Sequence, residues 1–411
     1  MSHKVDSTRM EQMITPELRK LVDLFTKNNF EIKIAGGAVR DLLSGTKIPD
    51  DIDLATTATP TEMKEMFTKE SIRMINDQGE KHGTITARID DNVNFEVTTL
   101  RIDKVTDGRR AEVEFTKDWR IDAERRDLTI NSMFLEMDGT IVDFFDGHKD
   151  LQQNRVMFVG SAEKRIQEDY LRIMRYFRFY GRISKDENSH DKATLDAIRI
   201  NGEGLSRVSG ERIWMEWRKI LAGPMGGPMT VKMIDLELGP YIGLPEVPNV
   251  EAFQNFWEQK VQKVHHITLL SQLLKTQEEM TTLNLRLKMS AYERDLGYFL
   301  IQYRDSIFTI KDWQKILIFS KNKSFHVKEW IIQAMICANT NFEEVEAFKN
   351  WEIPRFPVNG KELKEAGVPS GKFLGQCIEK LKLAWIDSDF KMDKEHLLKV
   401  ELPKIADDLA K

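Results

Sequence analysis

The chain has 411 residues, of which 41% are hydrophobic and 31% are charged, a balance typical of a soluble globular protein with two to four domains. No run approaches the roughly 18 apolar residues that a membrane span needs, and the two cysteines, Cys337 and Cys377, provide no disulfide framework. The formal net charge of −5 argues against a basic surface over the whole molecule, so any basic surface for nucleic acid must be local.

The first 160 residues alternate between strand and helix patterns. Residues 1–30 predict a helix that packs on the part of the chain that follows. Short apolar or alternating runs, bounded by glycine, asparagine and aspartate, then predict strands and hairpins. The predicted strands are residues 31–35, 51–56, 83–89, 93–99, 128–135 and 140–144. Helical periodicity dominates from about residue 161 to the end of the chain.

A glycine turn followed by two aspartates is the most informative feature of this first part. Gly36 and Gly37 follow the first predicted strand and precede a helix, and Asp51 and Asp53 lie about a dozen residues later. In a strand these two carboxylates point to the same face. Two carboxylates beside a helix N-terminus can hold a pair of hard cations on a triphosphate, and glycines let the backbone approach the phosphates. The alternative interpretation is a solvated acidic turn.

A second group of charged residues lies in the helical stretch 168–178. Asp169, Arg172 and Arg175 are spaced by three residues and share one face, which Arg178 extends. Leu171, Met174 and Phe177 repeat on another face and are expected to be buried in the core. An ordinary helix with surface ion pairs is the alternative.

The pair Asp169 and Arg172 has the chemistry to select nucleobases. Cytosine and adenine each present an amino donor beside a ring-nitrogen acceptor, so a carboxylate and a guanidinium pair with both. Uracil and guanine present an acceptor beside an N–H donor, so both contacts would be mismatched. Such a site could select C and A without a nucleic-acid template.

These motifs, in this order, resemble those of class II CCA-adding enzymes, the tRNA nucleotidyltransferases, and the animal form most. The resemblance is dense over residues 30–220 and thinner beyond. The matching segments are Gly36–Asp41 with Asp51–Asp53, Arg125–Asp127, Asp143–Gly147, Glu168–Arg172, Ser209–Ile213 and, near the C-terminus, Val358–Leu363 and Gly367–Lys372.

The resemblance implies an α+β fold: a mixed-sheet nucleotidyltransferase head of the polymerase β type, followed by an all-helical neck, body and tail. The implied boundaries are 1–160 for the head, 161–225 for the neck, 226–290 for the body and 291–411 for the tail, which would bind tRNA. It also implies addition of CCA to the tRNA 3′ end from CTP and ATP, with release of pyrophosphate. No membrane and no required protein partner are expected.

Site roles follow from the same resemblance. Asp51 and Asp53 would be the catalytic residues and hold two Mg²⁺ ions, and Glu96 on a neighbouring strand is a candidate third carboxylate. A plain outward strand charge is the alternative for Glu96. Asp127 would contact the ribose 2′-hydroxyl. The nucleotide-binding residues would be Gly36, Gly37, Arg40, Arg126, Asp127, Asp169, Arg172, Arg175 and Arg178. Arg172→Ala is expected to relax selection toward U and G.

Two segments raise further expectations. Residues 101–115, with Asp107–Arg110 at their centre, look like a flexible loop that helps the change from C to A addition, or else a plain surface loop. The family motif at Asp143–Gly147 usually has an arginine nine residues after its glycine, where this chain has Met157. Arg155 would replace that arginine as the partner of Asp143, or the contact is missing.

Local charge and targeting signals add little more. Residues 155–182 contain seven basic and three acidic side chains, a local excess of four positive charges beside the expected site. Residues 1–20 include Asp6, Glu11 and Glu17 and lack the acid-poor pattern of a transit peptide. By resemblance the protein is intracellular, in mitochondria, in the nucleus and cytosol, or in both.

Three further interpretations complete the expectations. Gly367–Lys372 would be a turn into a helix capped by Ser370, which could bind a tRNA phosphate. A poly(A) polymerase of the same superfamily would share the motifs of the head and neck. A tRNA-binding protein without catalytic activity is the other alternative, and the intact Asp51, Asp53, Asp169 and Arg172 argue against it.

Overall fold

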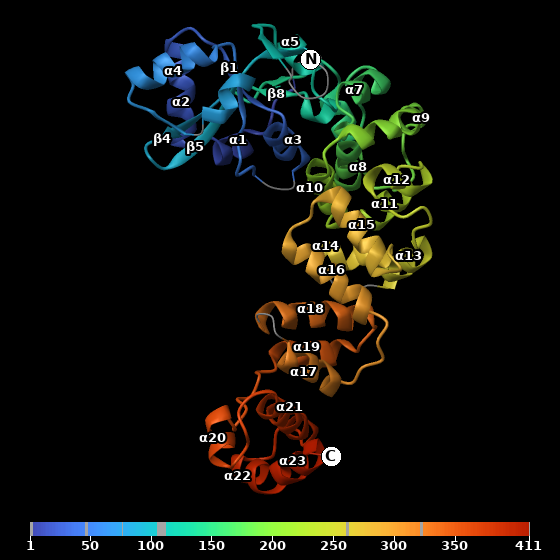
Figure 1. Cartoon of the computed structure of the whole chain (residues 1–411). Coiled ribbons are helices and arrows are strands. Elements are labelled where there is room, and N and C mark those ends of the chain that lie inside the picture. The colour runs from blue at the N-terminus through green and yellow to red at the C-terminus, as the bar shows by residue number, and fades with distance from the viewer. Residues whose placement is uncertain are drawn as a thin grey trace. The chain divides into compact units, whose positions relative to one another are not determined.

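A computed structural model describes residues 3–45, 48–75, 77–104, 112–259, 263–320 and 324–410 of the chain. The chain divides into two compact units (Figure 1). The first comprises Met1–Pro248 and Thr282–Met289, and the second comprises Asn249–Thr281 and Ser290–Lys411. The finer division into head, neck, body and tail stays a prediction.

Seven strands in the described part of the first unit form one mixed sheet in the order β3-β4-β5-β2-β1-β8-β9. β2 and β5 run parallel, and the other neighbouring pairs run antiparallel. The strand bounds are β1 Ile32–Ala35, β2 Leu54–Thr56, β3 Arg73–Ile75, β4 Thr84–Ile89, β5 Val93–Thr99, β8 Phe134–Leu135 and β9 Ile141–Val142. A separate two-stranded sheet pairs β6 (Arg101–Lys104) with β7 (Glu112–Phe115). The predicted mixed-sheet head is therefore confirmed.

Alternating burial along the strands creates an apolar face that helices cover. In β4 the side chains of Ile85, Ala87 and Ile89 are buried while their neighbours are partly exposed, as period-two geometry requires. Helices α2 (Pro16–Lys27) and α4 (Pro60–Lys69) pack on the sheet, and their rings Phe25 and Phe67 lie 5.9 Å apart between centroids (Figure 1). The remaining helices of this part are α1 Ser7–Met13, α3 Gly37–Ser44, α5 Trp119–Glu124 and α6 Gly147–Gln152, with 3-10 turns η1 Asp77–His82 and η2 Thr129–Asn131.

Several predicted elements differ from the observed ones. Residues 1–30 form two helices, because Thr15 caps a new helix with Pro16 at its first position. The predicted strand 128–135 is mostly the turn η2, with strand only at its end. The predicted strand 51–56 begins at Leu54, so both aspartates precede β2.

Helices make up the rest of the described first unit. They are α7 Ala162–Glu168, α8 Leu171–Ile183, α9 Lys192–Asn201, η3 Gly202–Arg207, α10 Gly210–Leu221, α11 Gly226–Asp235 and α12 Gly239–Ile242. The long amphipathic helices α8 and α10 pack against each other (Figure 1). Leu171, Met174 and Phe177 are buried, as their spacing predicts.

The described part of the second unit is all helical, which confirms the predicted helical remainder. Its helices are α13 Val250–Gln259, α14 His266–Gln272, α15 Gln277–Leu287 (whose end belongs to the first unit), α16 Ala291–Tyr303, α17 Ile310–Phe319, α18 Ser324–Cys337, α19 Phe342–Asn350, α20 Gly360–Glu365, α21 Lys372–Asp387, α22 Lys394–His396, the π-helical turn η4 Leu397–Glu401 and α23 Leu402–Ala410. The cap expected at Ser370 is wrong: Gly371, with φ 105°, caps α21 without a side-chain bond.

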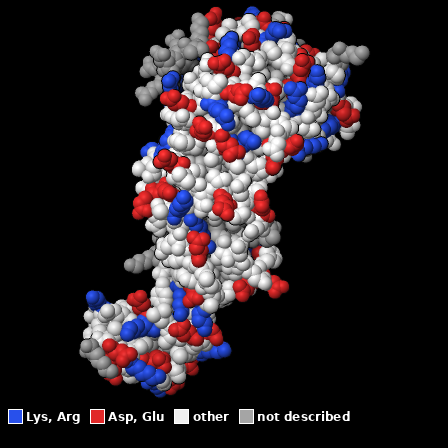
Figure 2. All heavy atoms as spheres, turned by 90° about the vertical axis from the view of Figure 1, so that its right-hand side faces the viewer, with Lys and Arg blue, Asp and Glu red and all other residues white. Residues whose placement is uncertain are grey.

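The face drawn in Figure 2 mixes acidic and basic side chains rather than gathering one sign in a single patch. On the face drawn, charge alone therefore marks no surface for nucleic acid. In the ranges that the structure describes, no helix is both long and apolar enough to cross a lipid bilayer.

Candidate active site

A cavity of about 670 Å³ in the first unit brings together most of the predicted site residues. It is lined by the turn after β1, by β4 and β5, by the segment from α5 to η2, and by α8 and α10. Ten of the eleven predicted residues line it: Gly36, Gly37, Arg40, Asp53, Arg126, Asp127, Asp169, Arg172, Arg175 and Arg178. Asp51, the eleventh, is exposed two residues before Asp53.

The turn between β1 and α3 needs glycine for two reasons. Gly36 has a backbone φ of 65°, which residues with a side chain rarely adopt. A Cβ atom built on Gly36 would also lie 2.9 Å from Nη1 of Arg126. The turn is therefore held close to an arginine, and its backbone opens onto the cavity as the sequence predicts.

The carboxylates gather where β2 begins beside the middle of the parallel strand β5. Because Leu54 of β2 is in register with Val97 of β5, Asp53 lies beside Glu96. Asp51 and Asp53 are exposed while Ile52 is buried, so the two acids face the same way although they precede the strand. Nearby protein atoms still reduce the hydration of the Asp53 carboxylate, and together with the charges of Asp51 and Glu96 this raises the pKa of Asp53 to about 6.

This group of carboxylates fits a hard divalent cation, which takes oxygen ligands and would relieve the repulsion at Asp53. Glu96 also lines the cavity, as expected of a third carboxylate. The side chains are not arranged as a closed cage: the described ranges contain no group of three or more histidine, cysteine or acidic residues spaced to hold a metal. An open site is what a bridging substrate requires.

Asp169 and Arg172, the predicted base-reading pair, lie at a helix junction rather than inside one helix. α7 ends at Glu168, and α8 begins at Leu171. Asp169 accepts a hydrogen bond from the Leu171 N–H through Oδ1 (3.1 Å) and pairs through Oδ2 with Arg212 Nη2 (2.8 Å). The predicted continuous helix 168–178 is therefore wrong at its first residues, but the break points Asp169 into the cavity.

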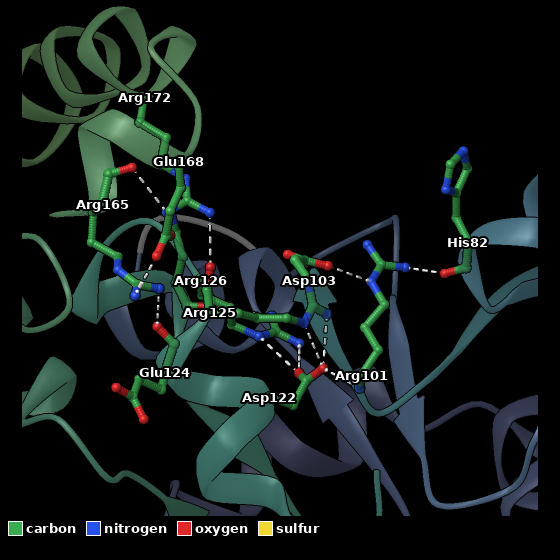
Figure 3. A network of polar contacts seen from close by, with 11 residues as sticks. His82, Arg101, Asp103, Asp122, Glu124, Arg125, Arg126, Arg165, Glu168 and Arg172 are labelled. Atoms are coloured by element: carbon green, nitrogen blue, oxygen red, sulfur yellow. Dashed lines mark hydrogen bonds and ion pairs between the residues drawn. The ribbon is translucent and has the colours of Figure 1, made fainter. Parts of the chain in front are cut away.

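Arg172 is held by three hydrogen bonds, none of them to Asp169. Nη1 donates to Glu168 Oε2 (2.8 Å) and to the Arg165 carbonyl (3.1 Å), and Nη2 donates to the Arg125 carbonyl (2.9 Å), as Figure 3 shows. A guanidinium has five N–H donors, so these bonds leave two to face a base. Asp169 and Arg172 thus keep separate partners, and neither neutralises the other.

The buried Asp127 forms an ion pair with the partly exposed Arg175, with 2.6 Å between Oδ2 and Nε. Burial alone would raise the pKa of Asp127, but the positive charge of Arg175 and the hydrogen bonds from Arg175 and Asn131 outweigh burial and lower it. Asp127 therefore stays ionised. Asn131 also accepts a hydrogen bond from Arg40, which joins the glycine turn to the same network.

Three arginines surround the ring of Phe179, which also lines the cavity. Their guanidinium carbons lie 4.3 Å (Arg178), 4.6 Å (Arg40) and 5.5 Å (Arg175) from the ring centroid, within range for cation–π attraction. Arg178 also pairs with Glu216 of α10 (3.1 Å between Nε and Oε2).

Four residues of this arrangement were missed by sequence reasoning: Phe179, Arg212, Glu216 and Asp122. Arg212 and Glu216 are four residues apart on α10, Glu216 among its buried residues, and that spacing could have indicated polar contacts on one side of the helix. Asp122 of α5 carried a similar signal, because it pairs with Arg125 and Arg126, three and four residues later in the chain. For Phe179 the sequence carries no comparable signal for its contact with Arg40, which is distant in the chain.

Two expectations at the edge of the site fare differently. Asp143 accepts hydrogen bonds from the backbone N–H groups of Phe145, Gly147 and His148, whereas Arg155 pairs with Asp150 at 3.9 Å. Of the two alternatives, Arg155 as the partner of Asp143 is therefore wrong, and the structure agrees with the other, that this contact is missing. The expected loop 101–115 begins and ends as the strands β6 and β7, and its centre at Asp107–Arg110 lies outside the described residues.

Comparison with known proteins defines the class. A family model described as the poly A polymerase head domain matches residues 32–157, and one described as a probable RNA- and SrmB-binding site of polymerase A matches residues 190–249. The mixed-sheet head is thus similar to the poly A polymerase head domain.

Curated relatives define the family within that class. Human "CCA tRNA nucleotidyltransferase 1, mitochondrial" is 47% identical over 96% of this chain and 92% of its own length. The zebrafish protein of the same name is 47% identical over 97% and 93%. The CCA-adding enzyme of Ligilactobacillus salivarius is 30% identical over 94% and 96%. The chain belongs to the CCA tRNA nucleotidyltransferase family.

Solved structures share the fold. The Bacillus stearothermophilus CCA-adding enzyme in complex with CTP superposes with a TM-score of 0.75 at 24% identity, covering 97% of this chain and 99% of the other. The Thermotoga maritima enzyme complexed with tRNA gives a TM-score of 0.71 at 19% identity, covering 100% and 99%.

Proposed function

We propose that this protein adds and repairs the 3′-terminal CCA of tRNA without a template, using CTP and ATP and releasing pyrophosphate. The observation that carries the proposal is one cavity whose lining includes both the carboxylates Asp53 and Glu96 and the Asp169 and Arg172 pair. The carboxylates supply a site for nucleotidyl transfer, and the pair supplies selection of C and A. Family membership at 47% identity over 96% of the chain supports the same activity.

The base-reading step follows from hydrogen-bond direction. The Asp169 carboxylate accepts from the amino group of cytosine or adenine, and a remaining Arg172 N–H donates to the adjacent ring nitrogen. Uracil and guanine would place an acceptor against Asp169 and a donor against Arg172. Arg172→Ala should therefore relax selection toward U and G. That variant should keep the carboxylate site intact, which binding of Mn²⁺, measured by its paramagnetic signal, would check.

The arginines of the cavity bind the triphosphate. Arg126, Arg175 and Arg178 face the same space as the glycine turn, and a guanidinium fork suits phosphate oxygens. Arg40 is only 4% exposed and is engaged by Asp41 and Asn131, so it contributes positive potential behind the turn. Asp127 remains the proposed contact for the ribose 2′-hydroxyl, on the side not used by Arg175.

Mg²⁺ is the proposed cation, held by Asp51 and Asp53 with Glu96 beside them. When bound, two Mg²⁺ ions would lower the pKa of the attacking tRNA hydroxyl and neutralise charge on the phosphates. We also place the four predicted parts at 1–160, 161–225, 226–290 and 291–411, and the protein in mitochondria, in the nucleus and cytosol, or in both. The mitochondrial names of animal relatives support the first location.

The test uses tRNA that lacks its CCA end, Mg²⁺, and labelled CTP, ATP, GTP and UTP, singly and together. Addition of C, C and then A by the unmutated protein is expected. Asp51→Asn/Asp53→Asn should lose that addition by several orders of magnitude. The matched control is Asp90→Asn/Asp91→Asn, which neutralises two aspartates in the turn between β4 and β5, away from the cavity.

Each other outcome points elsewhere. Long runs of A without C would make the protein a poly(A) polymerase, and a single A would make it an enzyme that completes partial ends. Binding of tRNA without any addition would favour the non-catalytic alternative. Full activity of the Asp51→Asn/Asp53→Asn variant would refute the proposed catalytic carboxylates.

A further inference from the structure

Asp122 is a buried carboxylate at which three parts of the first unit meet. It lies on α5, and 1% of its side chain is exposed. Oδ1 accepts from the backbone N–H of Arg101 (3.1 Å) and from Arg125 Nε (2.9 Å). Oδ2 accepts from Arg126 Nε (3.3 Å) and Nη2 (3.1 Å), so both oxygens are used (Figure 3).

The first partner is the hairpin of β6 and β7. Arg101 is the first residue of β6, so its bond to Asp122 fixes where the hairpin leaves the main sheet. Arg125 reaches the same strand, because its Nη1 lies 3.4 Å from Oδ2 of Asp103. The hairpin is thus connected to α5 twice, and Arg125 takes part in one of the two connections.

The second connection runs to the base-reading residue. The Arg125 carbonyl accepts a hydrogen bond from Arg172 Nη2, which is one of the three bonds that orient that guanidinium. Asp122 holds the Arg125 side chain, with 2.8 Å between Oδ1 and Nη2. A displacement of Arg125 would therefore move the acceptor that turns Arg172 toward the cavity.

The third partner is Arg126, which lies against the glycine turn. Besides Asp122, it donates to the Asn131 carbonyl (3.2 Å) and stacks over Phe134, 4.8 Å from the ring centroid. Burial alone would raise the pKa of Asp122, but the charges of Arg126 and Arg125 outweigh burial and lower it. Asp122 is thus an anion shared by two arginines of the cavity.

We propose that Asp122 is a positioning residue for nucleotide selection: through Arg125 it orients Arg172 toward the base, through Arg126 it orients the phosphate-binding side, and it links both to the β6–β7 hairpin. The inference rests on the proposed function. It assigns no contact between Asp122 and substrate, because the carboxylate is buried beneath the arginines. The packing of α5 on the sheet is supplied separately by Trp119 and Ala123, which belong to a buried apolar cluster.

The experiment compares Asp122→Asn with Glu124→Gln. Asparagine keeps the shape of Asp122 but removes the charge, and its NH₂ group cannot accept from an arginine. Glu124 lies on the same helix with an exposed carboxylate turned away from the network in Figure 3, so its variant controls for loss of a charge on α5. For Asp122→Asn we expect KM for CTP and ATP to rise, and the ratio of kcat/KM for CTP over UTP to fall by about tenfold.

A purely structural role for Asp122 would lower the melting temperature and the active fraction while leaving the CTP-to-UTP ratio unchanged. That result, or a ratio equal to that of Glu124→Gln, would overturn the proposal. If Asp122→Asn does not fold, Asp103→Asn supplies the test at a more exposed position of the same network. A fall of about threefold in the ratio is expected there, and no change would refute the coupling.

Failure of the proposed function would be recognised separately. It would show as an unmutated protein that adds neither C nor A to tRNA. Failure of the inference would show as an active unmutated protein whose Asp122→Asn variant keeps the unmutated ratio of kcat/KM for CTP over UTP.

Discussion

At the scale of single residues, the site is organised by shared partners rather than by isolated pairs. Asp122 serves two arginines and a backbone N–H group, and Phe179 lies among three guanidinium groups. Bringing like charges together without substrate is unfavourable, so each shared group reduces the repulsion among the arginines. The cavity therefore keeps its positive side chains ordered before a triphosphate arrives.

Phe179→Leu should weaken nucleotide binding with little effect on the chemical step. A cation–π contact contributes about 0.5–2 kcal/mol, so losing the aromatic ring should raise KM for CTP and ATP about five- to tenfold. Steady-state kinetics on tRNA lacking CCA would measure the change. Phe179→Tyr keeps the ring and should retain low KM values.

Phe177→Leu is the matched control, because Phe177 is fully buried on the same helix. It should lower the melting temperature and leave KM close to that of the unmutated protein. Equal KM values for Phe179→Leu and Phe177→Leu would contradict the role assigned to Phe179.

At the scale of elements, α10 is placed by a close backbone approach. A Cβ atom on Gly210 would lie 1.6 Å from the carbonyl oxygen of Arg286. The Arg286 side chain in turn donates to the carbonyls of Leu205 (2.9 Å) and Val208 (3.0 Å), just before the helix. These contacts fix the start of the helix that carries Arg212 and Glu216.

Gly210→Ala should destabilise the first unit by about 3 kcal/mol or more, because the new Cβ atom would clash with the Arg286 backbone, which cannot move away as a flexible side chain could. Urea unfolding followed by circular dichroism would measure the loss, and nucleotide affinity should fall with it as α10 shifts. Gly375→Ala is the control: a Cβ there meets nothing within 4 Å inside α21, so a neutral or slightly stabilising result is expected. A Gly210→Ala variant as stable as that control would disprove the close approach.

The elements also show where sequence reasoning succeeds and fails. The strands, the glycine turn and the buried face of α8 follow from periodicity and turn residues, which act locally. The break between α7 and α8 has no proline or glycine to announce it. It is stabilised by contacts distant in sequence: Asp169 pairs with Arg212, and the ring of Tyr170 packs where Gly204 leaves room.

The turn η2 was mistaken for a strand for a related reason. Thr129, Asn131 and Ser132 bond to Asp150, to Asp127 and to the Thr129 carbonyl, respectively. Such side-chain bonds offer the backbone an alternative to a sheet ladder. The candidate site residues that belong to one sequence motif were predictable. Their partners from distant parts of the same chain were not.

At the scale of the whole molecule, each compact unit contains a histidine that burial keeps neutral. His190 in the first unit is stacked on Tyr180, with 3.6 Å between ring centroids, and burial and the charge of Lys232 lower its pKa to about 4. His265 in the second unit accepts the Ile267 N–H through Nδ1 as the cap of α14, and burial with neighbouring His266 lowers its pKa to about 4.

Both units should lose stability as pH falls below neutral. An unfolded histidine takes up a proton near pH 6.5, whereas these folded ones resist until about pH 4. The unfolded state therefore binds more protons in that window, and acid favours it. The loss at pH 5 should be on the order of 1 kcal/mol for each histidine once solvent screening is allowed for.

Denaturant unfolding at several pH values between 7.5 and 5 would measure this. In His190→Gln the slope of the unfolding free energy against pH should be shallower than in the unmutated protein, whatever the change in absolute stability. An identical slope would show that His190 is not the group responsible.

The glycine turn at residue 36 limits the mutational paths open to this protein. A side chain at that position meets two independent barriers, the backbone at φ 65° and the neighbouring Arg126. Shortening Arg126 would remove only the steric barrier and would lose an arginine proposed to bind phosphate, so no single second substitution restores tolerance. In a randomised library selected for activity, only glycine should therefore remain at residue 36, whatever residue stands at position 126. At residue 126 some other residues should be tolerated when nucleotide is supplied in excess.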